Sequence, residues 1–196
     1  MRGAALAATF AAALLAGCAA ASPSAAAPPA TAPRAVEQPP MPARAVDDAQ
    51  PDFNGIGPLH WNMDAASMRR AWGRPLYPEA APADARACYY LSPRQGRHDL
   101  LLMVEGDRFV RVDVRRADKV APGGGRVGMR VEDIRRLYAG RIEARPHRYV
   151  EGGQTLVVAS PYGGAARLVF EIGADGAVSA WRIGLPPQVD YVEGCS

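Results

Sequence analysis

The second half of the chain alternates apolar and polar positions in a way that predicts β-strands. In RFVRVDV (108–114), Phe109 or Val110 faces inward with Val112 and Val114, so the remaining positions stand on a wet face. Five further runs have the same strand character: 86–91, 99–105, 154–160, 166–172 and 177–183. Turn signals at Gly106–Asp107 and at Asp175–Gly176 predict hairpins between neighbouring runs.

A short helix is predicted ahead of each set of three strands. In the second, Val131, Ile134 and Tyr138 are spaced i, i+3 and i+7, which places them on one face of a helix. In the first, Asp64 is suited to the N-cap, and Gly73 ends the helix because glycine readily adopts the left-handed conformation.

The two predicted helices are similar in sequence. NMDAASMRRAWGRP (62–75) aligns with GMRVEDIRRLYAGR (128–141), so that Trp72 matches Tyr138, and both rings are expected in the core. The strands that follow keep the same spacing. The sequence therefore predicts an α+β fold of two tandem α-β-β-β repeats, 52–120 and 121–196, joined through APGGGR (121–126). Neither repeat buries its apolar face well alone, so we expect one antiparallel sheet with the helices packed on one side.

The N-terminus reads as an export signal. Met1–Arg2 is followed by an uncharged run too short to span a bilayer, which ends in LLAGC (14–18). This resembles the lipobox of bacterial lipoproteins. The resemblance implies a signal peptide over 1–17, lipid on Cys18 and, because Ala19 is not aspartate, an outer-membrane lipoprotein whose domain lies in the periplasm or at the cell surface.

An Ala/Pro-rich segment follows the lipobox. Of the 33 residues from Ala19 to Pro51, 12 are alanine and 8 are proline. Proline blocks both helix and sheet, and such a composition buries too little apolar surface to offset the entropy of ordering. We expect residues 18–51 to be a disordered tether that carries the folded part away from the membrane.

Charge and cysteine content narrow the function classes. The folded part carries 20 basic against 17 acidic residues, too even a balance to predict nucleic-acid binding. Cys88 and Cys195 remain once Cys18 carries lipid, and an oxidising compartment favours a single disulfide between them. Two distant cysteines and three scattered histidines do not predict a metal site.

The first helical motif resembles a known family. Met63 to Pro75 is similar to the helical motif of the BamE (SmpA/OmlA) family, small outer-membrane lipoproteins that bind partner proteins, and two such units in tandem resemble the β-lactamase inhibitory protein. The second copy departs from the motif at Ala139 and at Ile142. The resemblance implies a fold and a protein-binding role, and no contact residue is carried over from it.

No catalytic motif stands out. GGGRVG (123–128) lacks the lysine of a phosphate-binding loop, and no nucleophile elbow, zinc-protease or Cys-x-x-Cys pattern is present. Glu105 and Asp107 flank a turn, and solvation of that turn explains them better than a glycosidase pair. The sequence favours a protein that is not an enzyme and uses no cofactor.

Binding is the remaining class, and aromatic residues among arginines are its candidate anchors. The candidate aromatics are Trp61, Tyr77, Tyr90, Tyr149, Tyr162, Trp181 and Tyr191. Arg111, Asp113 and Arg115 form either a binding stripe or a solvated charge ladder, and Trp181 could face either way. Arg111, Asp113, Arg115, Tyr162 and Trp181 are the predicted ligand-binding set. They fit a non-catalytic protein-interaction module, such as a hydrolase inhibitor or assembly factor. The alternative is a lectin-like protein that recognises cell-wall or surface polysaccharide.

Overall fold

The computed structural model describes residues 48–195. The predicted signal peptide, the predicted lipid attachment at Cys18 and the predicted tether up to residue 47 lie outside the described residues. Within them, no helix is long and apolar enough to cross a membrane.

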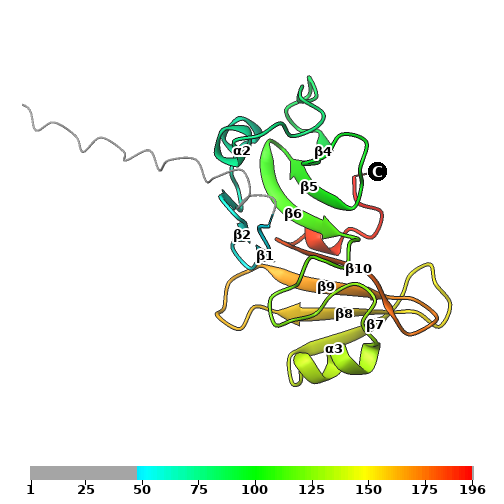
Figure 1. The fold of residues 1–196 in the computed structure, drawn as a ribbon. Coiled ribbons are helices and arrows are strands. Elements are labelled where there is room, and N and C mark those ends of the chain that lie inside the picture. The colour runs from blue at the N-terminus through cyan, green and yellow to red at the C-terminus, as the bar shows by residue number, and fades with distance from the viewer. Residues whose placement is uncertain (1–47, 196) are drawn as a thin grey trace, which may run out of the picture. The chain divides into compact units, whose positions relative to one another are not determined.

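A seven-stranded antiparallel sheet dominates the structure (Figure 1). Its strands run in the order β4 (Cys88–Leu91), β5 (Leu100–Glu105), β6 (Arg108–Val114), β10 (Val178–Gly184), β9 (Arg167–Ile172), β8 (Gln154–Ala159) and β7 (Ile142–Pro146). The final strands of the two halves, β6 and β10, pair at the centre, with Trp181 opposite Val114 and Ile183 opposite Val112. The architecture is therefore α+β, as the sequence predicts.

Both helices contribute side chains to one core on the same side of this sheet. Helix α2 (Ala65–Trp72) buries Met68 and Trp72, and α3 (Val131–Leu137) buries Ile134, with Tyr138 directly after it. The strands add alternate apolar residues such as Leu102, Val112, Leu156, Phe170 and Ile183 to the same cluster. We call this side the helix face. Trp72 and Tyr138 are both buried in its core, which confirms the prediction for both rings.

The predicted caps of the first helix are confirmed. The Asp64 carboxylate accepts hydrogen bonds from the hydroxyl of Ser67 at 2.7 Å and from its backbone N–H at 2.8 Å, and these bonds, the hydroxyl's above all, lower the pKa of Asp64. Gly73 ends the helix with φ at 69°, the left-handed conformation that favours glycine.

Three elements are absent from the sequence-based prediction. A small sheet precedes α2, formed by β1 (Pro51–Asp52), β2 (Gly55–Ile56) and β3 (Leu59–His60). Strand β7 forms an edge of the main sheet, and a 3-10 helix, η1 (Gln188–Asp190), follows β10. The strands of the small sheet are too short to show alternation, and the polar, proline-ended β7 is typical of an edge strand.

The folded part begins earlier than predicted, and residues 49–51 do not belong to the tether. The Lys119 ammonium donates a hydrogen bond to the Ala49 carbonyl at 2.8 Å, and the Gln50 side chain accepts one from the Val120 N–H. Pro51 is buried. Composition could not reveal this boundary, because it depends on partners 70 positions away.

The APGGGR segment (121–126) packs closely against Tyr138, directly after α3, and against Phe170 on β9. The Tyr138 hydroxyl accepts a hydrogen bond from the Gly125 N–H at 3.0 Å and donates one to the Pro122 carbonyl at 2.8 Å. A Cβ on Gly125 would come within 2.5 Å of the Phe170 ring. These glycines therefore permit close contact as well as connecting the two halves.

Replacing Tyr138 by phenylalanine is expected to reduce the free energy of unfolding by about 1–3 kcal/mol, because the buried Gly125 N–H and the Pro122 carbonyl lose their shared partner. Urea denaturation measures the change. Tyr162→Phe is the control, since Tyr162 is 92% exposed and should stay within about 0.5 kcal/mol of the wild type. Equal stability of the two variants would contradict the prediction.

Candidate functional site

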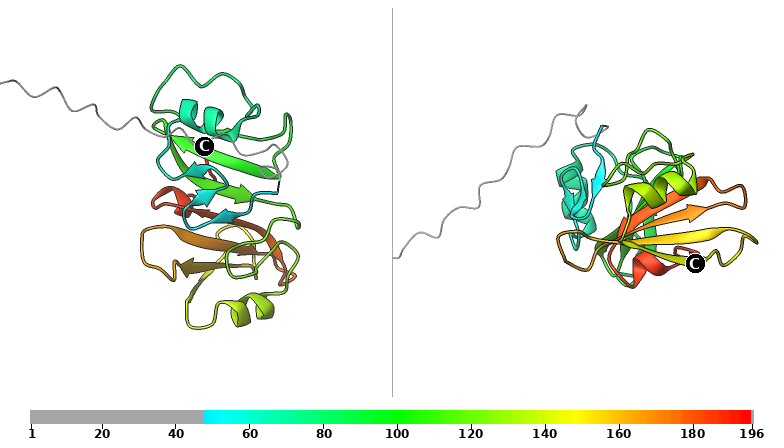
Figure 2. Two further views of the ribbon diagram at one scale, coloured as in Figure 1. Left: turned by 60° about the vertical axis from the view of Figure 1, so that its left-hand side comes forward. Right: turned by 90° about the horizontal axis from the view of Figure 1, so that it is seen from below.

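The C-terminal segment crosses the side of the sheet opposite the helices. Residues 185–195, which we call the C-terminal strap, include η1 and end at Cys195. In the right-hand view of Figure 2, α3 lies on one side of the strands and the red strap on the other. We call the side that it crosses the strap face. It carries the residues that alternate with the core, among them Arg111, Asp113 and Arg182.

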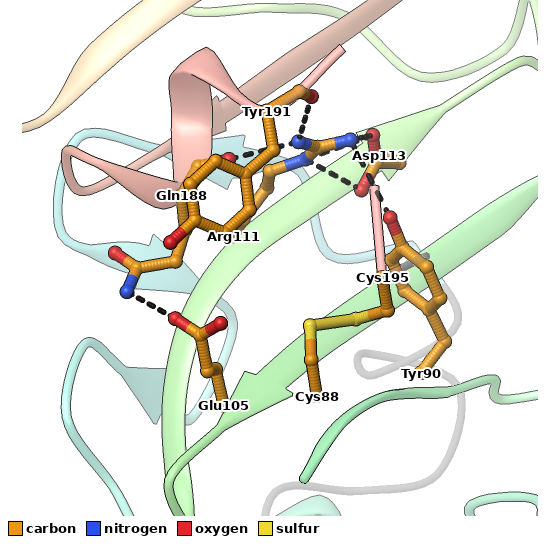
Figure 3. The surroundings of a disulfide bond; sticks show 8 residues. All are labelled: Cys88, Tyr90, Glu105, Arg111, Asp113, Gln188, Tyr191 and Cys195. Atoms are coloured by element: carbon orange, nitrogen blue, oxygen red, sulfur yellow. Dashed lines mark hydrogen bonds and ion pairs between the residues drawn. A yellow bond between two sulfur atoms is a disulfide. The ribbon is translucent and has the colours of Figure 1, made fainter. Parts of the chain in front are cut away.

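Arg111 holds the middle of the strap (Figure 3). Its guanidinium donates hydrogen bonds to the backbone carbonyls of Gln188 at 2.8 Å and Tyr191 at 2.7 Å. On the sheet side it forms an ion pair with Asp113, with N–O distances of 2.6 to 3.0 Å. Arg111 is only 3% exposed, and all its nitrogens have partners within the protein.

A second arginine, Arg182, lies beside it on β10. Its Nε donates a hydrogen bond to the Val189 carbonyl at 2.6 Å, and its Nη1 forms a hydrogen-bonded ion pair with the Glu171 carboxylate. Arg182 is 5% exposed. Burial lowers its pKa, and the neighbouring charge of Arg111 lowers it further, while Glu171 and Asp113 counteract the shift. The guanidinium remains charged, since arginine does not lose its proton in proteins.

The end of the strap is fixed covalently. The predicted disulfide joins Cys88 on β4 to Cys195, with the two Cα atoms 5.3 Å apart (Figure 3). Gly194 has φ at 72°, and a Cβ at this position would lie 2.3 Å from the Tyr90 hydroxyl. Only glycine therefore fits between the disulfide and the Tyr90 ring.

A hollow of about 370 Å³ opens between the strap and the turn that joins β7 to β8. Tyr149 from this turn reaches the strap, where its hydroxyl is bonded to Glu193, and this bond raises the pKa of Tyr149. Tyr149 is 56% exposed. The residues around the hollow are Cys88, Glu105, Arg148, Tyr149, Tyr191, Val192, Glu193, Gly194 and Cys195.

A narrower cavity of about 100 Å³ lies beside the hollow, over β8 and β9. We call it the arginine cleft, because Arg145, Arg148 and Arg182 line it. His147, Thr155, Glu171 and Asp190 contribute the other polar side chains, and Val157, Val169 and Val192 are among the apolar ones. On the other side of the strap, Arg115 lines a third cavity of about 150 Å³ together with Arg111, Asp113 and Glu193.

The predicted binding residues do not all meet. Arg111, Asp113 and Arg115 share the strap face, but Arg111 is occupied by the strap and Asp113 by Arg111. Tyr162 lies apart, at the tip of the β8–β9 hairpin.

The structure corrects the prediction for Trp181. Its ring is 1% exposed within the core of the helix face, where Val114 and Phe170 are its cross-strand partners. A ring in this position cannot stack on a ligand. Alternation along β10 explains the burial, because Arg182 faces the strap and its neighbour Trp181 must therefore face the core.

Among the other aromatic candidates, Tyr90, Tyr149 and Tyr191 gather at the strap face. Trp61 instead packs on Phe109, with ring centroids 4.8 Å apart, and donates its indole N–H to the Phe53 carbonyl. Tyr77 forms a backbone bridge with Ser92.

Sequence reasoning missed Arg182, Arg148, His147 and Thr155. The alternation of AVSAWRI signalled that Arg182 and Trp181 face opposite sides, although it did not show which side is open. Gly152 and Gly153 signal the turn that carries His147 and Arg148, but not which face of the sheet that turn approaches.

Glu105 and Asp107 are held by different parts of the chain. The Glu105 carboxylate accepts a hydrogen bond from the Gln188 side chain, whereas Asp107 accepts one from the Ala65 N–H at 3.1 Å. Residues 48–195 contain no group of three or more histidine, cysteine or acidic side chains placed to hold a metal ion.

Comparison with known proteins reveals only remote likenesses. No protein-family model matches the chain, and no curated protein sequence does. A DUF4309 family protein (YjgB) from Bacillus subtilis is similar in structure, with a TM-score of 0.43 and 11% identity over 73% of this chain and 92% of that one. An extracellular protein containing a SCP domain from Bacillus anthracis has a TM-score of 0.40 and 11% identity, covering 64% of this chain and 44% of that one. The chain thus spans less than half the length of the SCP-domain protein, and neither likeness assigns it a function.

Proposed function

We propose that this protein is a lipid-anchored, non-catalytic interaction module of the bacterial cell envelope, and that it binds a partner protein through its strap face. The lipobox at Cys18 and the Ala/Pro-rich segment after it support the anchorage and export. The resemblance of Met63 to Pro75 to the BamE motif supports the protein-binding role. A hydrolase inhibitor and an envelope assembly factor both fit this description.

The hollow at the strap is the observation that carries the proposal. It brings Tyr149, Tyr191 and Arg148 together in a concave site, and tyrosine and arginine are the residue types that dominate binding energy in protein interfaces. The disulfide and the bonds of Arg111 hold one wall of this site in place before a partner arrives. Such preorganisation reduces the entropy lost on binding.

We further infer that the sheet consists of two α-β-β-β units in tandem. The strand order supports this, since β4-β5-β6 of the first half and β8-β9-β10 of the second meet through their last strands. Strand β7 has no full counterpart in the first half, where only the Tyr77–Ser92 bridge lies in the equivalent place.

Capture from envelope extracts tests the proposed function. The full chain, purified in detergent, should retain a protein partner in a stoichiometric complex. Tyr149→Ser should weaken that complex at least tenfold, because hot-spot residues contribute about 2 kcal/mol or more and 1.4 kcal/mol is a factor of ten.

The matched control is Tyr162→Ser, which removes an exposed tyrosine away from the hollow and should leave the affinity unchanged. Loss of binding in Tyr162→Ser alone would place the partner on the β8–β9 hairpin and contradict the assignment to the strap face. Retention only on purified cell-wall glycan, competed by free sugar, would replace the proposal by the lectin-like alternative.

A further inference from the structure

The arginine cleft contains an unusual arrangement of hydrogen-bond donors. Arg182 bonds to Val189 through Nε and to Glu171 through Nη1, but its Nη2 has no hydrogen-bond partner among residues 48–195. Within the same residues, the only fully buried side-chain nitrogen or oxygen without a partner is Nε1 of Trp181. The Nη2 of Arg182 therefore keeps some contact with solvent, through the cavities that Arg182 lines.

His147 supplies a second donor whose proton position follows from its contacts. Its Nδ1 accepts hydrogen bonds from the backbone N–H groups of Tyr149 at 3.1 Å and Val150 at 3.2 Å. An imidazole nitrogen that accepts carries no proton, so in the neutral ring the proton is on Nε2. His147 is thus held in the form that donates from Nε2.

Two more donors of the cleft have no hydrogen-bond or ion-pair partner in the described part of the chain. They are the Thr155 hydroxyl, which comes from β8, and the guanidinium of Arg148, which lies 5.8 Å from the Tyr149 ring centroid. Arg148 lies in the turn between β7 and β8, Thr155 on β8 and Arg182 on β10. Donors from separate elements that line one cavity, and that its two carboxylates do not all engage, suit an oxyanion.

The net charge of the arginine cleft differs from that of the cavity beside Arg115, and it indicates the charge of the ligand that the cleft would bind. Three arginines and two carboxylates line the arginine cleft, which leaves one positive charge with His147 neutral. The cavity beside Arg115 has three arginines and three carboxylates, and so no excess. One positive charge matches a singly charged carboxylate better than a doubly charged phosphate. The volume of about 100 Å³ is several times the roughly 10–15 Å³ that one water molecule needs, so the cleft has room for a carboxylate and its adjoining methylene.

We propose that the arginine cleft binds the carboxylate of an acidic side chain that the partner protein inserts beside the strap. This rests on the proposed function, and it adds the chemistry that the partner must present. The hollow then receives the apolar surface around that side chain, because Arg148 and Val192 line both cavities.

Propionate, which reproduces the end of a glutamate side chain, is the probe. The midpoint of thermal unfolding of the full chain in detergent is measured at increasing propionate concentrations and constant ionic strength. We expect the midpoint to rise and the rise to follow a saturable binding curve. Arg148→Gln and Thr155→Val should each weaken propionate binding at least about tenfold, because each removes a hydrogen bond to a charged group. Methyl phosphate should bind more weakly than propionate.

Arg126→Gln is the control for the change in net charge, since Arg126 is exposed and does not line the cleft. Its propionate response should equal that of the wild type. The proposal would be overturned if the unfolding midpoint rose linearly with propionate concentration, without saturation, or rose equally in all variants. Tighter binding of methyl phosphate than of propionate would also overturn it and would make the cleft a phosphate site.

The cleft and the proposed function can fail separately. Tyr149→Ser should lose the partner protein while keeping the propionate response, because Tyr149 lines the hollow and not the cleft. Thr155→Val should weaken both. Capture of a partner that Thr155→Val does not affect would overturn the cleft alone, and a normal propionate response with no partner would overturn the proposed function alone.

Discussion

Replacing Arg111 by methionine is expected to lower the free energy of unfolding by about 3–5 kcal/mol, the usual cost of removing one member of a buried ion pair. Arg111 is 3% exposed and joins the sheet to the strap. Its loss leaves the Asp113 carboxylate without its cation and frees the carbonyls of Gln188 and Tyr191. Methionine is unbranched and apolar, so it fills much of the same space without restoring any of these bonds.

Urea denaturation of the disulfide-bonded protein measures this effect. The control is Arg115→Met on the same face, two residues further along the chain. Arg115 is exposed and has no side-chain partner in the described part of the chain, so its replacement should change the free energy of unfolding by no more than about 0.5 kcal/mol. If the two variants unfold at the same urea concentration, the strap does not depend on Arg111.

Reduction of the Cys88–Cys195 disulfide should cost up to about 5 kcal/mol. The bond closes a loop with a sequence separation of 107 residues, and the entropy that a cross-link removes from the unfolded chain grows with loop length. The strap also loses its covalent end, although Arg111 and Arg182 still hold its middle.

A comparison of unfolding with and without dithiothreitol measures this loss. The double variant Cys88→Ser/Cys195→Ser should have the low stability of the reduced protein and should not respond to the reductant. A wild-type protein whose stability is the same in both conditions would contradict the prediction. Because Arg111 and the disulfide act on the same segment, their losses should not add when both are removed.

The alternation of apolar and polar residues and the helix-capping residues were sufficient to predict most of the secondary structure. Alternation over 108–114 placed Val112 and Val114 in the core, and the helix caps at Asp64 and Gly73 are as predicted, because each depends on residues close in sequence. The disulfide could also be predicted, since in an oxidising compartment Cys88 had one partner once Cys18 was set aside.

The candidate site could not be predicted from the alternation of apolar and polar residues, because that pattern does not show which strand face a later segment covers. Alternation shows that Arg111 and Arg182 face away from the core, but an exposed strand face and one covered by a later segment have the same sequence pattern. The strap covers this face through contacts up to 107 positions apart. Trp181 was assigned to the wrong side for the same reason, since either face of β10 could have been the buried one.

Local periodicity and a short list of cysteines were enough to predict the α+β class, the disulfide, the helix caps and which residues share a face of each strand. The path of the folded chain was needed to show which face the C-terminal strap covers, that Arg111 is occupied by it, and that Arg148, Thr155 and Arg182 line one cleft. Those facts depend on how a chain returns to distant strands, and the free energy of that return is spread over many contacts that no single stretch of sequence contains.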